Sequence, residues 1–399
     1  MKYRLIELLR CPHCQKPLSC TEFSSSKNNY ALEMKEYLKG KNACSEFCGL
    51  NRVQIKNKAF DCASCYEIEI DEGMLSCECG RLYPIIDSIP RLLPDPLRMR
   101  ILKEKHNDFL KKYADKFHSE ICHNLDDISA VKKKTLDSFG FEWKKFSKMH
   151  DAYKEQFLTW ITPLNSDFFK DKLVLDAGCG LARHTYYSSV FGAEVVGIDL
   201  SDAIDIARSN TRSLPRVHLI QADLYNLPLS QKFDFIYSIG VIHHLPDPEN
   251  GFRVLLRHVK KNGHILVWLY GREHNTLMVN ILDPARRHVL SKVPHSLLNI
   301  LCYVPTSIWY SLLRMVYHPL NKYNSKFVNL LPYNSYFYQV SQFDFNHTQL
   351  IVFDLLSAPL ANYYTKRDLR GWIERANLKN IALTWRNENS WIMFGEIGK

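Results

Sequence analysis

The chain has 399 residues, of which 46% are hydrophobic and 24% are charged. This composition is typical of folded globular proteins and argues against a disordered or fibrous chain. The length favours about two to three domains and suffices for a buried core without disulfide staples. The 52 Lys and Arg against 42 Asp and Glu give a formal charge of +10, which suits an anionic partner such as RNA or acidic lipid and equally an ordinary solvated surface.

The N-terminus predicts a cytoplasmic protein, because charged residues interrupt the short apolar stretch of residues 1–10 and no secretory signal is present. No apolar run reaches the roughly 18 residues that a spanning helix needs, so no transmembrane segment is expected. The most apolar stretch, residues 297–317, is interrupted by Asn299, Pro305 and Arg314.

Nine of the twelve cysteines lie between Cys11 and Cys79. In a cytosolic chain, thiols paired at short spacing indicate a metal before a disulfide. Two such pairs complete a tetrahedral structural zinc site. We therefore expect one or two structural zinc ions, and buried or redox-active thiols without metal are the alternative. The outer set of ligands is Cys11, Cys14, Cys77 and Cys79, and the inner set is Cys44, Cys48, Cys62 and Cys65.

Two blocks at the ends of this segment resemble a small zinc-ribbon family. They are Leu9-Arg-Cys-Pro-His-Cys14 and Cys79-Gly-Arg-Leu-Tyr-Pro-Ile-Ile-Asp-Ser-Ile-Pro-Arg-Leu-Leu-Pro94. The family includes the activator subunit shared by several eukaryotic tRNA, rRNA and protein methyltransferases, and short bacterial relatives of which some are fused to methyltransferases. The insert that carries the inner set departs from the short family form. The resemblance implies a Cys-rich zinc-ribbon-like domain at residues 1–96, without chemistry of its own because thiolates close each ligand set.

A polar, Lys-rich stretch follows, and we expect residues 97–150 to form a helical linker. From residue 151, short apolar runs alternate with amphipathic stretches, which is the pattern of βαβ units on a parallel sheet. The ligand of such a sheet lies beyond the carboxyl ends of its strands. The predicted strands are Leu173–Leu175, Val195–Ile198, Val217–Ile220, Phe233–Ile239 and Ile265–Leu269, and the predicted helices include Ala203–Asn210 and Phe252–Lys260.

The first strand leads into the turn Asp176-Ala-Gly178-Cys-Gly180, and the second strand ends in Asp199. A glycine-rich turn with an acid about 20 residues later is the general dinucleotide pattern, so NAD is one candidate. The third glycine is absent, however, and a carboxylate at Asp176 would repel a pyrophosphate at the helix N-terminus. S-adenosylmethionine has no phosphate and carries an ammonium group and a sulfonium group, so the acid suits it. Asp199 can accept hydrogen bonds from both ribose hydroxyls.

Two further motifs follow the third and fourth strands, Gln221-Ala-Asp223-Leu224 and Tyr237-Ser-Ile-Gly-Val-Ile-His-His-Leu-Pro-Asp-Pro248. With the two earlier acids, this ordered set resembles the class I S-adenosylmethionine-dependent methyltransferases, in the subgroup that acts mostly on small molecules and lipids. The resemblance implies a Rossmann-like α/β fold with a seven-stranded sheet, formed by a cofactor-binding core at residues 151–271 and a last helix and hairpin at residues 365–399. The residues that it implies at the cofactor are Asp176, Gly178, Gly180, Asp199, Leu200, Asp223, Leu224 and Ser238.

Residues 272–364 are a long insert, which we expect to be a mainly helical lid over the acceptor pocket, because loops of this length are rarely without structure. The helix Thr365–Ala376, with Thr365 as its N-cap, and the strands Ile381–Trp385 and Trp391–Phe394 should follow it. One helical face of the insert can pack on the core or lie on a membrane surface, and both interpretations stay open. That face comprises Ile308, Trp309, Leu312, Leu313 and Val316.

Methyl transfer to oxygen or nitrogen needs an in-line acceptor and often a base with a pKa near the working pH. His244 and His243, after the fourth strand, are the candidate catalytic bases, and a packing or orienting role is the alternative. His347 and Tyr364 are weaker candidates. The sequence has neither the Asn/Asp-Pro-Pro-Tyr/Phe turn of amino-methylating nucleic-acid enzymes nor the Pro-Cys pair of cytosine C5 enzymes.

These motifs predict an S-adenosylmethionine-dependent methyltransferase that acts on a small-molecule, lipid-linked or glycan-linked acceptor, with peripheral membrane contact as an option. One alternative is an RNA methyltransferase that uses the zinc domain for substrate recognition. The other is a non-catalytic scaffold that binds the cofactor without consuming it.

Overall fold

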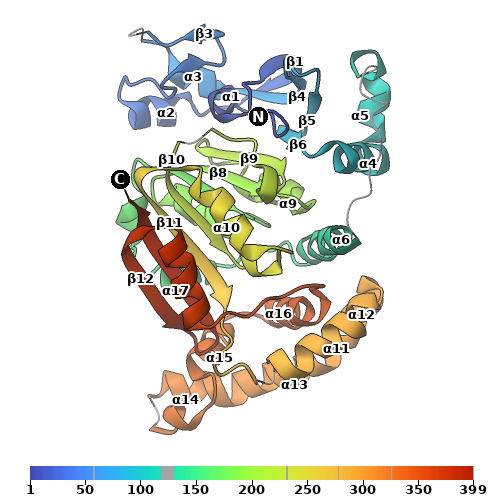
Figure 1. Ribbon diagram of the computed structural model, residues 1–399, viewed down its shortest axis with the longest axis vertical. Coiled ribbons are helices and arrows are strands. Elements are labelled where there is room, and N and C mark those ends of the chain that lie inside the picture. Colours follow the sequence, from blue (N-terminus) through green and yellow to red (C-terminus); the bar gives the residue numbers. More distant parts are fainter. Residues whose placement is uncertain (57–58, 118–129, 231, 277, 325, 399) are drawn as a thin grey trace.

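The computed structural model describes residues 1–398 apart from residues 57–58, 118–129, 231, 277 and 325. Its central feature is a mixed sheet of eleven strands in the order β1-β4-β5-β6-β9-β8-β7-β10-β11-β13-β12. Figure 1 shows the N-terminal segment and the helices of the insert at opposite ends of the long axis. The strands are β1 (Ser19–Lys27), β4 (Ile68–Ser76), β5 (Leu82–Ile86), β6 (Ile89–Leu92), β7 (Leu173–Ala177), β8 (Glu194–Asp199), β9 (Val217–Ala222), β10 (Phe233–Ile239), β11 (Val259–Tyr270), β12 (Leu378–Arg386) and β13 (Ser390–Ile397).

Seven of these strands form the Rossmann-like sheet that the sequence predicts. Strands β9, β8, β7, β10 and β11 are parallel neighbours, and β13 lies antiparallel between β11 and β12. Buried Val, Leu, Ile and Phe side chains dominate the parallel strands, because both faces of such a sheet are covered. The covering helices are α8 (Arg183–Val190), α9 (Ala203–Thr211), α10 (Pro248–Leu256) and α17 (Lys366–Arg375).

Capping signals set the ends of two of these helices. Thr365 caps α17 as predicted, since its hydroxyl accepts the N–H of Asp368 while the Asp368 carboxylate accepts the N–H of Thr365. The prediction of a helix over Phe252–Lys260 is wrong at both ends. Helix α10 begins after Asp247, whose carboxylate accepts the N–H of Asn250, and it ends before β11 begins at Val259.

The sheet continues past the seven predicted strands into the N-terminal segment. Strand β6 pairs in parallel with β9, with Arg91 opposite Gln221 and Leu92 opposite Ala222. The Arg91 side chain, 1% exposed, donates hydrogen bonds to the side chains of Gln221 at 3.0 Å and of Asp205 on α9 at 2.6 Å. Because a buried charge is tolerated only with such partners, these bonds fix β6 against the edge of the sheet.

A second contact holds the N-terminal segment to β8. Arg4 of α1 (Arg4–Leu8) forms an ion pair with Glu194 at 3.0 Å, and His218 and Tyr66 lie 3.0 and 3.3 Å from the same carboxylate. Burial would raise the pKa of Glu194, but the charge of Arg4 and the hydrogen bond with His218 outweigh it and lower this pKa to about 2. One continuous hydrophobic core therefore joins the N-terminal segment to the sheet.

The insert is mainly helical, as the sequence predicts. Its helices are α11 (Asp283–His288), α12 (His295–Leu301), α13 (Tyr303–Leu312), α14 (His318–Lys322), α15 (Asn334–Val340) and α16 (Phe345–Ser357), with a π-helical segment, η7 (Leu313–Tyr317), between α13 and α14. The stretch before the core contributes α4 (Asp95–Lys105), α5 (Asn107–Lys112), α6 (Ala130–Lys145) and α7 (Tyr153–Trp160). Helices α6, α15 and α16 lie beyond the carboxyl ends of the parallel strands, where they face the site described next.

Candidate functional site

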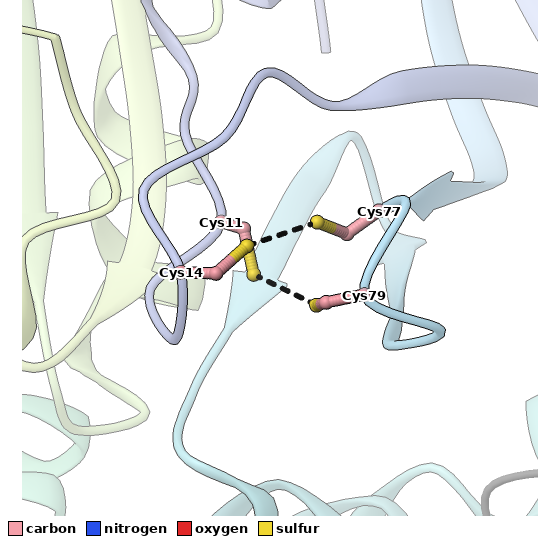
Figure 2. A group of neighbouring side chains, drawn as sticks. All are labelled: Cys11, Cys14, Cys77 and Cys79. Carbon is pink, nitrogen blue, oxygen red and sulfur yellow. Dashed lines mark hydrogen bonds between the residues drawn. The ribbon is translucent and has the colours of Figure 1, made fainter.

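The outer set of cysteines forms a compact group of thiols. The Sγ atoms of Cys11, Cys14, Cys77 and Cys79 all lie within 4.8 Å of one another, on two facing turns (Figure 2). Cys11 lies 3.7 Å from Cys79 and Cys14 lies 3.4 Å from Cys77. Four sulfurs at about 2.3 Å from a tetrahedral zinc ion lie roughly 3.8 Å apart, so this donor set fits structural zinc.

The inner set is less compact. Cys62 and Cys65 lie on α3 (Cys62–Glu67) and Cys48 ends a short strand, β2 (Phe47–Cys48). Burial and then the neighbouring thiols of Cys48 and Cys62 raise the pKa of Cys65 to about 12, so these thiols lie near one another. Among the described residues, however, only the outer set has all its sulfurs within 4.8 Å. The second zinc ion stays a prediction.

A cavity of about 310 Å³ lies at the carboxyl ends of the parallel strands. The turn after β7 and the ends of β8, β9 and β10 form one wall, and helices α6, α7, α15 and α16 form much of the rest. In folds of this kind the ligand binds at this edge of the sheet. Six of the eight residues predicted at the cofactor line the cavity: Gly178, Gly180, Asp199, Leu200, Asp223 and Leu224.

The two glycines of the turn after β7 leave space that side chains at the same positions would fill. Gly178 and Gly180 have φ values of +87° and +53°, in the left-handed region that favours glycine. A Cβ atom on Gly178 would lie 2.4 Å from Val241, and one on Gly180 would lie 3.2 Å from the ring of Trp143. Such a turn lets a ligand approach the backbone closely, as bound S-adenosylmethionine would require.

Asp199 lies next to this turn, and hydrogen bonds fix the orientation of its carboxylate. Its carboxylate accepts the N–H of Gly180 at 2.9 Å and the N–H and hydroxyl of Ser201 at 2.8 and 2.7 Å. Burial raises the pKa of Asp199, and the bonds from Ser201 and Gly180 oppose that rise. A carboxylate has about four lone-pair sites, and these three bonds leave one site on Oδ2 that can accept a ribose hydroxyl.

Two predicted cofactor residues lie behind the cavity wall and stay predictions as ligand contacts. Asp176 is 1% exposed and lies outside the cavity wall, where it accepts the hydroxyl of Thr185 at 2.6 Å. Burial raises the pKa of Asp176 to about 7. Ser238 is fully buried and donates to the carbonyl of Ala177 at 2.7 Å. Both residues support the turn from behind, because they belong to β7 and β10 and not to the loops beyond them.

The two candidate bases differ in position. His243 is fully buried against Tyr270, at a ring-centroid distance of 4.0 Å, and does not line the cavity, so it is not placed to reach an acceptor. His244 does line the cavity. Its Nδ1 lies 2.6 Å from the carbonyl of Leu360, which can only accept, so Nδ1 carries the proton and Nε2 has a free lone pair. Burial lowers the pKa of His244 and keeps the ring neutral.

Of the weaker candidates, only His347 lines the cavity. Its Nδ1 is hydrogen-bonded to the Tyr153 hydroxyl at 3.1 Å. Tyr364 packs instead against Trp372 of α17, at a ring-centroid distance of 5.0 Å.

Three charged residues of the cavity wall were not selected from the sequence. Glu142 of α6 is buried with no hydrogen-bond partner for Oε2, and burial and the charge of Asp354 raise its pKa well above the usual value. Asp354 of α16 accepts the hydroxyl of Tyr270 at 3.3 Å. Arg183 begins α8, with its guanidinium 5.2 to 5.6 Å from three aromatic rings. The available signals were an acid inside an apolar helix, for Asp354, and a cation directly after the glycine turn, for Arg183.

Charge in the cavity fits the cofactor. Arg183 can pair with the methionine carboxylate, since a guanidinium binds carboxylates with two parallel hydrogen bonds. Asp199 offers an acceptor for the ribose in the same cavity.

Comparison with protein families matches two parts of the chain. Residues 175–267 match the family described as methyltransferase domain, and residues 2–88 match the family described as Trm112p-like protein. The first match covers the glycine turn, Asp199 and Asp223, and the second covers all eight predicted zinc ligands.

Curated relatives are methyltransferases and related enzymes. A tRNA U34 carboxymethyltransferase of Actinobacillus succinogenes is 24% identical over 238 residues, which are 57% of this chain and 69% of that protein. A ubiquinone biosynthesis O-methyltransferase of Hydrogenovibrio crunogenus is 28% identical over 34% of this chain and 59% of its own length. A tRNA U34 carboxymethyltransferase of Vibrio cholerae is 31% identical over 34% of this chain and 42% of its own length. Most of these relatives are therefore matched over less than two thirds of their length.

Fold, cavity and family matches together define the class of the protein as an S-adenosylmethionine-dependent methyltransferase. More particularly, it is a class I methyltransferase domain joined to an N-terminal Trm112p-like zinc-ribbon domain, as the sequence predicts.

The thiol cluster predicts that Cys14→Ser removes zinc from the protein and lowers the temperature at which the N-terminal segment unfolds, because structural zinc stabilises the fold that binds it. Metal analysis and thermal unfolding measure both effects. Cys20→Ser, outside both sets, is the control. Cys48→Ser tests the inner set, since loss of a separate zinc ion would show a second site. A metal-free wild-type protein that is folded would contradict the zinc assignment.

The geometry around Asp199 predicts that Asp199→Ala lowers the affinity for S-adenosylmethionine by at least about tenfold, since a hydrogen bond to a charged acceptor is lost. Calorimetric titration measures the affinity, and circular dichroism checks that the fold is retained. Asp108→Ala, at an exposed position of α5 outside the cavity wall, is the matched control. Unchanged affinity in Asp199→Ala would refute the ribose assignment.

Proposed function

We propose that this methyltransferase acts on a hydroxyl or amino group of an apolar acceptor, a small molecule or a lipid-linked molecule, bound inside the cavity. The observation that carries the proposal is the composition of the cavity wall opposite the glycine turn. Aliphatic and aromatic side chains predominate there, namely Leu136, Phe139, Trp160, Trp268, Met278, Tyr336, Phe337, Val340, Leu350, Ile351 and Leu355. An apolar wall with a few convergent polar groups is typical of small-molecule sites.

The polar groups of the wall suit an acceptor that must lose a proton. Burial and the charge of Asp354 raise the pKa of Glu142 well above its usual value, so Glu142 tends to keep its proton. The carboxyl groups of Glu142 and Asp354 can hold the hydroxyl or amino group of the acceptor. His244, with its Nε2 lone pair, is the candidate for taking the proton.

When bound, the cofactor supplies an electrophilic methyl group on its sulfonium. Beside it, His244 would take up at Nε2 the proton that the acceptor atom loses as it becomes methylated. The insert and α6 keep water from the reacting atoms, so the chain contributes orientation, exclusion of water and a base.

An RNA acceptor is the second candidate. It is favoured by the names of two of the relatives above, tRNA U34 carboxymethyltransferases, and by the formal charge of +10. A flipped nucleobase could enter an enclosed cavity of this kind. RNA binding of this type weakens steeply with salt, whereas binding of an apolar acceptor does not.

The proposal predicts where label goes when the purified protein is incubated with methyl-labelled S-adenosylmethionine and extracts of its host. Label should appear in the lipid or small-molecule fraction, because the cavity accommodates an apolar acceptor. The Asp199→Ala variant is the control for enzyme-dependent label. Label in RNA would overturn the proposal in favour of the second candidate, and cofactor binding without any label would support the idle scaffold.

The position of His244 predicts that His244→Gln lowers kcat by about 10²- to 10⁴-fold, the usual contribution of a general base, while leaving the affinity for S-adenosylmethionine unchanged. Turnover on the labelled fraction and calorimetric titration separate the two effects. His288→Gln, an exposed histidine on α11, is the matched control. Full activity of His244→Gln would exclude the residue as the base.

A further inference from the structure

The insert carries an exposed apolar surface on its longest helical stretch. Helices α12, α13, η7 and α14 run as one nearly continuous stretch over His295–Lys322, which is long and apolar enough to cross a membrane. This corrects the prediction that Pro305 interrupts the segment. Proline lies in the first turn of α13, where its missing N–H costs little.

The exposed side chains form one stripe along this stretch, which we name the outer stripe: Leu297, Ile300, Leu301, Val304, Ile308, Leu312 and Met315. The residues recur every three or four positions, so they share one helical face. Val304 and Ile308 are each 68% exposed, and Met315 is 71% exposed. Single exposed apolar residues are ordinary, but a contiguous stripe of them marks an interaction surface.

The opposite face of the helical stretch packs against the rest of the protein. Trp309 and Tyr317 pack against Phe337 of α15, at ring-centroid distances of 5.4 and 5.0 Å, and Leu313 is fully buried. Buried Gln349 of α16 donates to Asn299 at 3.0 Å. The predicted apolar face is therefore split, because Trp309 and Leu313 point inward while Ile308 and Leu312 point outward. A helix with one face packed on protein and the other exposed suits the surface of a bilayer and not its interior.

Charge around the outer stripe complements an anionic surface. Residues 284–343 contain no Asp or Glu. Exposed cations lie near both ends of the stretch, with Arg287 and Lys292 before it and Lys322 and Lys326 at and beyond its end. Exposed Tyr303, Tyr323 and Phe327 add aromatic side chains of the kind enriched at membrane interfaces.

We propose that the outer stripe lies in the interfacial layer of an anionic lipid bilayer and docks the protein there as a peripheral membrane protein. Basic flanks attract acidic headgroups, and the stripe inserts its apolar side chains at the boundary with the acyl chains. Figure 1 shows α13 and α14 at the end of the molecule opposite the N-terminal segment, so the stripe can meet a flat surface without interference from that segment.

Docking there brings the membrane to the acceptor side of the cavity. The packing partner of Trp309, Phe337, itself lines the cavity, as do Tyr336 and Val340 of the same helix. One layer of helices thus separates the outer stripe from the site. The inference that the acceptor comes from the bilayer rests on the proposed function, whereas the docking itself does not.

Co-sedimentation with vesicles tests the docking. The full chain should bind vesicles of phosphatidylcholine with about one third phosphatidylglycerol, and it should bind pure phosphatidylcholine vesicles less well. The double variant Val304→Asp with Ile308→Asp should reduce binding at least about tenfold, since two inserting side chains become anions at an anionic surface. Leu32→Asp, an 84% exposed leucine of α2 (Ala31–Leu38) in the N-terminal segment, should bind like the wild type.

Absence of wild-type binding to the anionic vesicles, or equal binding by the double variant, would overturn the proposal. A wild-type dimer in solution that the double variant converts to a monomer would overturn it too, by assigning the stripe to a subunit interface. The vesicle assay contains no cofactor, so it tests the docking alone. A parallel incubation with vesicles of host lipid extract and methyl-labelled S-adenosylmethionine tests the acceptor: binding without label in lipid would contradict a lipid acceptor and leave the docking intact.

Discussion

The parallel pairing of β6 with β9 is the contact on which the rest of the structure depends. It buries the charge of Arg91, which then requires Asp205 and Gln221 as partners. Strand β9 leads into Asp223, and α9 follows the loop after Asp199, so the N-terminal segment braces both acids predicted at the nucleoside. No residue of positions 1–94, within the described part of the chain, lines the cavity. The zinc ribbon therefore packs on elements behind the cavity wall and is not part of the wall itself.

The cavity owes its chemistry to helices outside the Rossmann-like sheet. Helix α6 provides Glu142 and α16 provides Asp354, and burial together with the charge of Asp354 raises the pKa of Glu142 well above its usual value. Neither helix is stable alone in water at this length, so each depends on packing against the other and on the sheet. The polar groups that would contact the acceptor are therefore brought together only when the insert is folded. The same packing exposes the outer stripe, because one face of the long helical stretch is used inside and the other is left outside.

The sequence predicted the parts of the structure that depend on local signals. Hydrophobic runs located the parallel strands, Thr365 marked a helix start, and short Cys spacings located the thiol cluster. The sequence did not predict the positions of side chains that depend on packing between distant parts of the chain. An acid just before a glycine-rich turn is typical of a ligand contact. Asp176, however, lies within β7, behind the turn, where it accepts the hydroxyl of Thr185. Nor can spacing show which of two adjacent histidines faces the cavity, since that depends on the rotation of the loop, and Glu142 lies in a linker whose partner helix is more than two hundred residues away in sequence.

The two ends of the molecule constrain how an acceptor can reach the cavity. The N-terminal segment lies at one end of the long axis and the helices that carry the outer stripe lie at the other (Figure 1), and helices of the insert line the cavity. An acceptor that enters from a membrane meets the insert first and never meets the ribbon. An RNA recognised by the ribbon would have to extend past the sheet to deliver its base, and the ribbon's own contacts with β8 and β9 already occupy the surface that faces the core. The arrangement therefore favours a supporting role for the N-terminal segment and entry of the acceptor from the side of the insert.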